Sequence, residues 1–319
     1  MRDALISKLL LLTACALAAG LCHAQKYRIG ALWPGSERSE AFVQALTEAG
    51  YREGANLVIE SRYADWQLRR LPALAEELVR RKPDLIFAPT NGAARAALGA
   101  TRTIPIVFAL APDPVEAGLV ASLARPGGNA TGTSNIQTGL TAKRLQLLEE
   151  AVPGLQRVGA IYDPDDSVSA DQMRELQAAA RELKLQMHAI QANRLDEYER
   201  AFAAFRKLRI GAVFVTGSVA SFRQRQAIAE LAIHHRLPTM NAAREYVEAG
   251  GLVSYGPDLA VLYRQSAGYV DRILKGTRPA DLPVQQPDRF ETQVNLRTAN
   301  AIGQQIPRSI LLRADRVVE

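Results

Sequence analysis

The chain has very few cysteines and histidines, the residues that most often bind transition metals or, for cysteine, act as a thiol nucleophile. Its 319 residues include two cysteines, Cys15 and Cys22, and both lie near the N-terminus. The remainder of the chain therefore has no thiol for a disulfide or for thiol chemistry. Of the four histidines, His234 and His235 are adjacent, and adjacent residues on a helix point about 100° apart, which is a poor arrangement for chelation. We expect no metal ion and no cofactor.

Motifs that would indicate an enzyme are also missing. The sequence contains no Gly-x-Gly-x-x-Gly, no P-loop and no Gly-x-Ser-x-Gly. The net charge of +6 is spread as isolated arginines with little aromatic interleaving, a pattern that does not favour nucleic-acid binding. These absences shift the balance from catalysis to binding, and we assign no catalytic residue.

The N-terminal segment is typical of a secretory signal. A charged start that includes Arg2 and Lys8 precedes an apolar run over 9–21, which is too short to span a bilayer comfortably. Small residues before position 25 predict cleavage after Ala24, so that residues 1–24 form a signal peptide and the mature chain enters the periplasm. The alternative is lipoprotein processing at Cys15, because LTAC is similar to a lipobox.

From Tyr27 onward, short apolar runs alternate with amphipathic stretches. This alternation predicts an α/β fold of two Rossmann-like lobes, each with a parallel sheet flanked by helices. The predicted strands are 27–32, 56–63, 84–88, 104–110, 157–163, 185–190, 211–216, 237–241 and 290–296. The predicted helices are 37–49, 68–81, about 91–100, 143–151, 169–183, 196–207, 220–235 and 259–275.

One strand-to-helix turn, within IFAPTNGAARAAL (86–98), has the composition of an anion site. Thr90 or Asn91 is suited to cap the helix, and Gly92 removes side-chain bulk. The first N–H groups of a helix lack partners and carry partial positive charge, so they can bind an anion. The alternative is that Asn91 is only the helix cap and nothing binds.

Polar residues follow most of the predicted strands. In open parallel sheets, ligands bind beyond the carboxyl ends of the strands. Two sheets that face each other would therefore gather these loops into one pocket. The loops are 33–37, 90–93, 111–114, 162–167, 216–218 and 241–243. The acidic run in 162–167 lacks the spacing of a calcium loop, so we expect it to cap a helix.

The segment IPIVFALAPDPVEAGLVASLARPGGNATGTS (104–134) resembles a signature of periplasmic substrate-binding proteins of ABC transporters, in the tryptophan/tyrosine-type group. The resemblance extends over essentially the whole mature chain. It implies a type I periplasmic-binding fold with a three-strand hinge, crossed near 133–134, 254–255 and 284–286. One lobe would comprise 26–134 plus 255–284, and the other 135–254 plus 285–319.

The same resemblance implies a small ligand, an amino acid or a related carboxylate. The first lobe would hold its carboxylate through residues 90–93, and Asp113 would either accept from its ammonium or serve a turn. In the second lobe, relatives carry Thr-Asp-Asn where this chain has Thr216-Gly217-Ser218, so the usual acid is missing. The predicted ligand-binding set is Trp33, Ser36, Thr90, Asn91, Gly92, Ala93, Asp113, Tyr162, Thr216, Ser218, Asn241 and Tyr255.

Some members of this set have a structural alternative. Trp33 either stacks on a ligand ring or covers the cleft, and Ser36 either contacts the ligand or caps the first helix. Tyr162, Asn241 and Tyr255 are equally suited to hinge or packing roles.

The resemblance predicts a monomer that captures its ligand by hinge closure and delivers it to an ABC permease in the inner membrane, without turnover. One alternative is a periplasmic sensor of the same fold that presents its ligand to a receptor. Another is an exported α/β enzyme, for which the candidate carboxylates are Glu37, Asp113 and the acids within 163–166.

Overall fold

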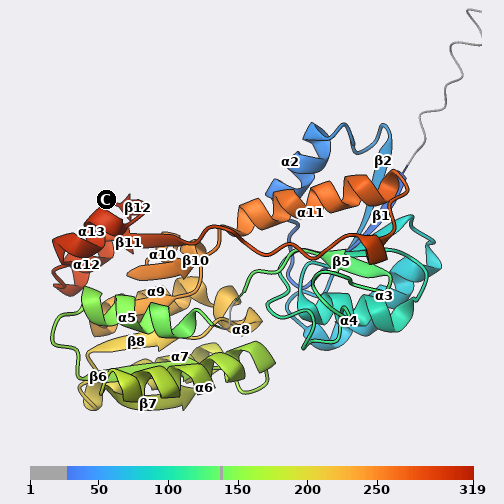
Figure 1. Cartoon of the computed structure of the whole chain (residues 1–319). Coiled ribbons are helices and arrows are strands. Elements are labelled where there is room, and N and C mark those ends of the chain that lie inside the picture. Colours follow the sequence, from blue (N-terminus) through green and yellow to red (C-terminus); the bar gives the residue numbers. More distant parts are fainter. Residues whose placement is uncertain (1–26, 137–138) are drawn as a thin grey trace, which may run out of the picture.

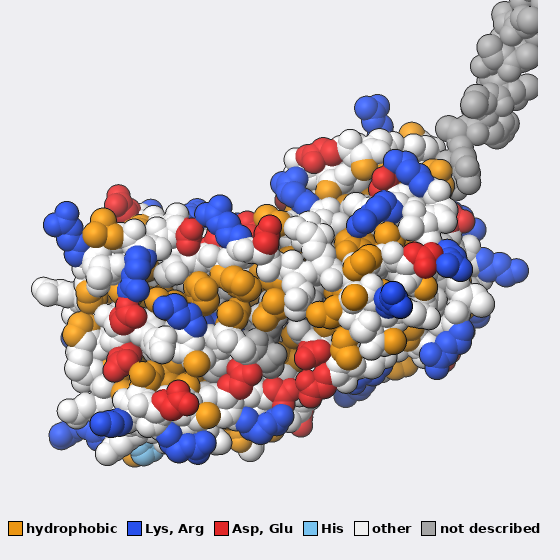
Figure 2. All heavy atoms as spheres, viewed as in Figure 1, with side chains coloured by type: hydrophobic (Ala, Val, Ile, Leu, Met, Phe, Trp, Pro, Cys, Tyr) orange, Lys and Arg blue, Asp and Glu red, His pale blue; other side chains and the backbone are white. Residues whose placement is uncertain are grey.

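The computed structural model describes residues 27–136 and 139–319, which form two lobes side by side (Figure 1). The predicted signal peptide, its cleavage site and Cys15 lie outside the described residues. Within the described ranges, no helix combines the length and the apolar character needed to cross a membrane. Figure 2 shows basic and acidic side chains interspersed over the visible face of both lobes.

The first lobe contains a five-stranded parallel sheet in the order β2-β1-β3-β4-β5. Side chains that alternate along β1 reach opposite faces: Trp33 packs with Phe42 on the α2 side, and Leu32 packs with Leu78 on the α3 side. The long helix α11 lies along α2 (Figure 1) and closes the same face. The strands are β1 Tyr27–Trp33, β2 Leu57–Tyr63, β3 Leu85–Phe87, β4 Ile106–Phe108 and β5 Ala130–Gly132. The helices are α2 Glu40–Glu48, η1 Leu68–Arg70, α3 Leu71–Arg80, α4 Asn91–Ala100, α11 Leu259–Leu274 and η2 Pro279–Asp281.

The second lobe contains a seven-stranded sheet in the order β12-β11-β10-β9-β8-β6-β7. Its strands pair in parallel except β10 with β11, which are antiparallel. The strands are β6 Arg157–Tyr162, β7 Gln186–Gln191, β8 Ala212–Val215, β9 Thr239–Asn241, β10 Val253–Gly256, β11 Glu291–Asn295 and β12 Arg316–Val318. The helices are α5 Thr141–Ala151, α6 Ser167–Glu182, α7 Leu195–Lys207, α8 Val219–Arg223, α9 Arg225–His235, α10 Arg244–Glu248, α12 Leu296–Ile302 and α13 Arg308–Arg313.

The chain passes between the lobes three times, after β5, after β10 and before β11. The first and third crossings run side by side, because Ser134 N–H donates to Gln285 O at 2.8 Å and Gln285 N–H donates to Gly132 O at 3.1 Å. The second crossing lies later than the predicted 254–255. Tyr255 still pairs with Thr292 in the seven-stranded sheet, so the chain leaves that sheet after Gly256.

Each of the first two crossings begins at a glycine packed against a neighbouring carbonyl. A Cβ on Gly132 would lie 1.9 Å from Phe108 O, and one on Gly256 would lie 1.9 Å from Ala242 O. Neither position has room for a side chain, because both contacts are with backbone rather than with a flexible side chain.

The predicted fold class is confirmed, and the differences are local. Residues 130–132, taken as part of a turn-rich run, form β5. The predicted helix 220–235 is interrupted at Gln224, which separates α8 from α9. The sequence pattern also missed α10, α12, α13 and β12, which are five, seven, six and three residues long. Periodicity has too few residues to register in segments this short.

Candidate functional site

The turn after β3 places a helix N-terminus at the carboxyl edge of the first sheet. Thr90 is the N-cap of α4, with extended backbone angles, and its Oγ1 accepts from Ala93 N–H at 3.4 Å. The loop is held to the next strand because Leu110 N–H donates to Pro89 O at 2.6 Å. Gly92 is exposed and adds no side chain over the turn. The first N–H groups of α4 are therefore presented beyond the sheet edge, where an anion can bind them.

Asn91 is the first residue of α4 and is not its cap. Its Oδ1 is buried and has no hydrogen-bond partner among the described residues. A buried acceptor without a partner costs free energy, roughly 1–3 kcal/mol, unless a ligand or water supplies a donor. The alternative in which Asn91 only caps the helix is therefore wrong, because Thr90 does that.

The corresponding turn of the second lobe is internally satisfied. Thr216 is 1% exposed; its Oγ1 donates to Ile161 O at 3.1 Å and lies 2.6 Å from Ser169 Oγ. Ser218 caps α8 by accepting from Ser221 N–H at 3.0 Å. Thr216 is thus an interior residue of the second lobe rather than a ligand contact, because its hydroxyl bonds neighbouring elements of the same lobe.

The structure contradicts the stacking prediction for Trp33 and the capping alternative for Ser36. The Trp33 ring is 2% exposed, and its centroid lies 5.3 Å from that of Phe87. Its indole N–H donates to Ser61 Oγ at 3.3 Å. A ring enclosed in the core presents no face to a ligand, so the stacking prediction for Trp33 is wrong. Ser36 is exposed in the loop after β1, and the cap of α2 is Ser39.

Among the remaining candidates, Tyr162 and Asp113 have local partners. Tyr162 accepts at its hydroxyl from Gln191 Nε2 at 2.9 Å, beside the edge strand β7. Asp113 Oδ1 accepts from Glu116 N–H at 3.1 Å. The second contact matches the turn alternative for Asp113, since an Asx side chain that bonds a following N–H stabilises a turn. In the acidic loop, Asp166 caps α6 by accepting from Ser169 N–H at 3.1 Å, as predicted.

Asn241 and Tyr255 lie at the carboxyl edge of the second sheet. Asn241 is 1% exposed, and its Nδ2 has no partner in the part of the chain that the structure describes. The backbone oxygen of Tyr255 accepts from Arg144 Nε at 2.7 Å, and its ring lies 6.0 Å from that of Phe290. Burial lowers the pKa of the Arg144 guanidinium to about 10. Tyr255 thus joins the second crossing to α5.

An apolar cluster joins the two lobes near these strand ends. The cluster combines Ala243 and Tyr246 of the second lobe with Leu259 and Leu262 of α11 in the first lobe, and Leu110 of the first lobe packs against it. The hydroxyl of Tyr246 lies 2.8 Å from Ser221 Oγ, which places α10 beside α8. Through Leu110, the segment that follows β4 therefore belongs to the same apolar cluster as Phe222 of α8 and Tyr246 of α10.

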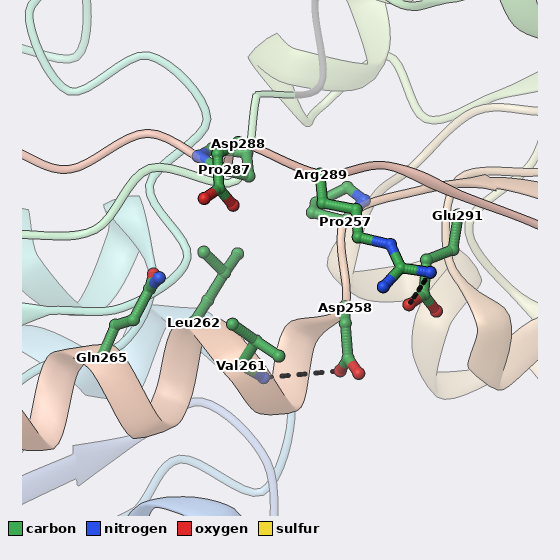
Figure 3. A pocket seen from close by; sticks show the side chains of 9 residues that line it. All are labelled: Pro257, Asp258, Val261, Leu262, Gln265, Pro287, Asp288, Arg289 and Glu291. Atoms are coloured by element: carbon green, nitrogen blue, oxygen red, sulfur yellow. Dashed lines mark hydrogen bonds and ion pairs between the residues drawn. The ribbon is translucent and has the colours of Figure 1, made fainter.

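Two hollows on the described part of the chain lie away from the turn between β3 and α4. One, of about 150 Å³, lies at the hinge between the start of α11 and residues 287–291 (Figure 3). The other, of about 560 Å³, is open and lies between the loop after β6 and α7. Neither is lined by the α4 turn. In the described ranges, no group of three or more His, Cys, Asp or Glu side chains could hold a metal ion.

The sequence reasoning missed Glu245, on α10. Its Oε2 is buried without a partner among the described residues, and its Oε1 lies 3.8 Å from Arg244 Nε. Burial raises the pKa of the Glu245 carboxyl. The signal that could have found it is its place, a few residues after the strand β9, among the loops that this architecture brings to the cleft.

The two sheets share one strand order over five strands and are joined by three crossings. The profile of the family described as "ABC transporter substrate binding protein" matches residues 36–318. The chain belongs to this family. Its members are solute-binding proteins, and the chain is accordingly a solute-binding component of the ABC transporter type.

The most informative relatives agree in fold and coverage. A "Tyrosine-binding protein" of Clostridioides difficile is 28% identical over 83% of this chain and 76% of its own. An ABC domain from Streptococcus pneumoniae, solved in complex with L-Trp, has a TM-score of 0.84 at 25% identity, over 92% of this chain and 100% of its own. The ligand-free, open structure of a Clostridium difficile substrate binding protein has a TM-score of 0.68 at 26% identity, over 92% and 99%.

Proposed function

We propose that this solute-binding protein captures an α-amino acid between its two lobes, with tyrosine and tryptophan as the first candidates. The α4 turn carries the proposal. It presents helix N–H groups and the unpartnered Oδ1 of Asn91 beside the Leu110 contact between the lobes. A helix N-terminus stabilises a carboxylate by hydrogen bonding and by its partial positive charge.

The arrangement of the lobes supports capture by closure. The two bacterial structures described above cover the same share of this chain at nearly equal identity, yet the TM-score is 0.84 for the L-Trp complex and 0.68 for the open, ligand-free protein. A rigid-body difference between lobes lowers a global score without changing either lobe. The higher score with the complex supports a lobe arrangement in this chain that is closer to that of the complex. A ligand that contacts both lobes would favour such a closed state.

The cellular part of the proposal follows from the sequence. The chain acts in the periplasm after cleavage at Ala24, as a monomer, and delivers its unaltered ligand to an inner-membrane permease. Support comes from the signal-like segment 1–24, and from the family assignment over 36–318.

A thermal-shift screen tests the ligand class. The mature chain, beginning at Gln25, is heated with each of the common amino acids and with sugars as a contrasting panel. A ligand at about 100 times its dissociation constant adds roughly 2.7 kcal/mol of stability. We expect tyrosine or tryptophan to raise the melting temperature and to be recovered chemically unchanged. Stabilisation by sugars alone, or turnover of the ligand, would contradict the proposal.

A further inference from the structure

A bound amino acid also presents an ammonium group, and the second lobe lacks the acid that the resemblance placed beside Thr216. Residue 217 is glycine, and Thr216 and Ser218 make their hydrogen bonds within their own lobe. On the first lobe, Asp113 Oδ1 is engaged by Glu116 N–H. A cation held in a low-dielectric cleft needs an anionic partner, because an unpaired buried charge is costly.

Glu245 is placed to meet this need. Helix α10 follows β9 at the carboxyl edge of the second sheet, and its next residue, Tyr246, belongs to the apolar cluster between the lobes. The Glu245 side chain is 23% exposed, and its Oε2 is buried without a hydrogen-bond partner in the described ranges. Arg244 does not neutralise it closely, because Arg244 Nη1 is 2.7 Å from Asp258 Oδ2, while its Nε is 3.8 Å from Glu245 Oε1.

The first lobe faces Glu245 with Tyr263 of α11. The negative charge of Glu245 acts on the Tyr263 hydroxyl and, together with burial, raises its pKa. The Tyr263 ring lies 6.3 Å from that of Phe87, the last residue of β3. Tyr263 thus connects the neighbourhood of Glu245 to the strand that leads into the α4 turn.

We infer that the Glu245 carboxylate binds the ammonium group of the amino acid, opposite the Tyr263 hydroxyl. The inference rests on the proposed function and deepens it, because it assigns the second half of the amino-acid recognition. The carboxylate of the ligand is held by α4 of the first lobe and its ammonium by α10 of the second. Such a ligand contacts both lobes through opposite charges, so the closed state is favoured by the same contacts that select an α-amino acid.

The pH dependence of binding has a definite sign. The groups that act on Glu245 are Arg244, which lowers its pKa, and Glu248 and Asp258, which raise it; burial is the largest effect and raises it. Tyr246 and Tyr263 are the neutral titratable neighbours. The ligand ammonium requires the ionised carboxylate, so affinity falls as pH decreases through the raised pKa.

Calorimetric titration with L-tyrosine and L-tryptophan tests the assignment on three proteins: the mature chain, Glu245→Gln and Glu248→Gln. Glu248 is the matched control, because it lies on the same short helix, is exposed and contacts Arg316 at 3.1 Å. We expect Glu245→Gln to weaken binding about 10-fold to 100-fold and to remove the loss of affinity at acidic pH. We expect Glu248→Gln to stay within about 2-fold of the unmodified chain.

The des-amino acids 3-(4-hydroxyphenyl)propanoate and 3-(indol-3-yl)propanoate complete the design. They retain the carboxylate and the ring, so we expect them to bind the unmodified chain weakly and to be insensitive to Glu245→Gln. The variant Tyr263→Phe, which keeps the ring, should lose a few-fold in amino-acid affinity. Amino-acid binding by Glu245→Gln within 2-fold of the unmodified chain would overturn the inference and leave the proposed function intact. Absence of amino-acid binding by the unmodified chain would overturn both.

Discussion

The two lobes share one strand order and use it differently. The first lobe has the order β2-β1-β3-β4-β5, and the second repeats it as β7-β6-β8-β9-β10 before adding β11 and β12. In the first lobe, the helix that follows β3 is α4, which has ten residues and carries the unpartnered Oδ1 of Asn91. At the same point of the second lobe, α8 has five residues, and the hydroxyl of Thr216 bonds inward. Equal topology therefore does not assign equal roles to equivalent positions.

What distinguishes the lobes is where buried polar groups find partners. The second lobe satisfies the turn after β8 internally and leaves the unpartnered acid one connection later, on α10. A ligand between the lobes would thus contact the turn after β3 in the first lobe and the segment after β9 in the second lobe. In the proposed site, this offset would give two chemically different walls, one that favours an anion and one that favours a cation.

The largest expected effect comes from replacing a glycine at the start of a crossing, a feature that both lobes have. Gly256→Ala would place a methyl 1.9 Å from Ala242 O, as a Cβ at Gly132 would against Phe108 O. We expect a loss of about 3 kcal/mol or more in the free energy of unfolding, because backbone on both sides must move. Denaturant unfolding followed by circular dichroism measures it.

The control for this change is Gly268→Ala on α11, where a Cβ would meet no atom within 4 Å. Because alanine favours a helix over glycine, this variant should gain up to about 1 kcal/mol. A Gly256→Ala protein as stable as the unmodified chain would mean that the crossing after β10 is not held as tightly as the structure indicates.

The next prediction compares the turn after β3 with the equivalent turn after β8. Asn91→Ala in the first lobe should weaken amino-acid binding about 10-fold, and it should raise the stability of the free protein by up to roughly 1–3 kcal/mol, because it removes a buried acceptor that has no partner. Thr216→Val in the second lobe should do the reverse. It removes the hydroxyl bond to Ile161 O, at a cost of about 1–2 kcal/mol in stability, and should leave affinity within 2-fold. Calorimetric titration and denaturant unfolding of both variants measure these effects. A loss of affinity in Thr216→Val together with a loss of stability in Asn91→Ala would contradict the prediction.

The smallest effect concerns the strands that the second lobe adds. Asp315 accepts from Thr292 N–H at 2.9 Å and lies 3.0 Å from Arg289, and these contacts lower the pKa of its carboxyl. The folded-state pKa lies below the unfolded value, so the stabilisation is present above about pH 4 and is lost as pH falls through the folded-state pKa. Since the side chain is 30% exposed, Asp315→Asn should cost less than about 1 kcal/mol at pH 7.

The measurement for Asp315→Asn is the pH dependence of its unfolding free energy relative to that of the unmodified chain. The difference should shrink as the pH falls below about 4 and vanish below the lowered folded-state pKa. The corresponding surface pair of the first lobe, Arg278 with Asp281, offers the matched variant Asp281→Asn. That carboxylate is more exposed, so its removal should have a smaller effect. A larger effect from Asp281→Asn would reverse the comparison.

Much of the fold is predictable from the sequence, because its strands and helices alternate with clear periods. The apolar runs of β1 and β6 and the amphipathic run of α11 lie within a few residues of the predicted ranges. The α4 turn is also predictable, since small polar residues directly follow a buried strand. The short strand β5 is not, because its residues Ala130–Gly132 follow a run rich in glycine and proline and carry no alternation.

Side-chain direction is the part of the site that the sequence does not determine. In a parallel sheet both faces are apolar, so a strand-end residue such as Trp33 carries no signal of whether it points into the core or toward the cleft. A shift of one residue reverses the face. Thr216 looked like a ligand contact by its place after β8, yet its partner is Ile161 on a neighbouring strand. Glu245 was missed because α10 spans only five residues.

The interleaved path of the chain governs how the molecule can assemble. Helix α11, which covers the first sheet against α2, comes after all the parallel core strands of the second lobe, while β11 and β12 of the second lobe come later still. A chain that emerges from its N-terminus onward therefore cannot complete its first lobe until residues 259–285 have followed. Until then, the apolar face of the first sheet that Ala267 and Val270 later cover stays exposed. The first lobe therefore begins first along the chain but is completed only after most of the second lobe has been synthesised.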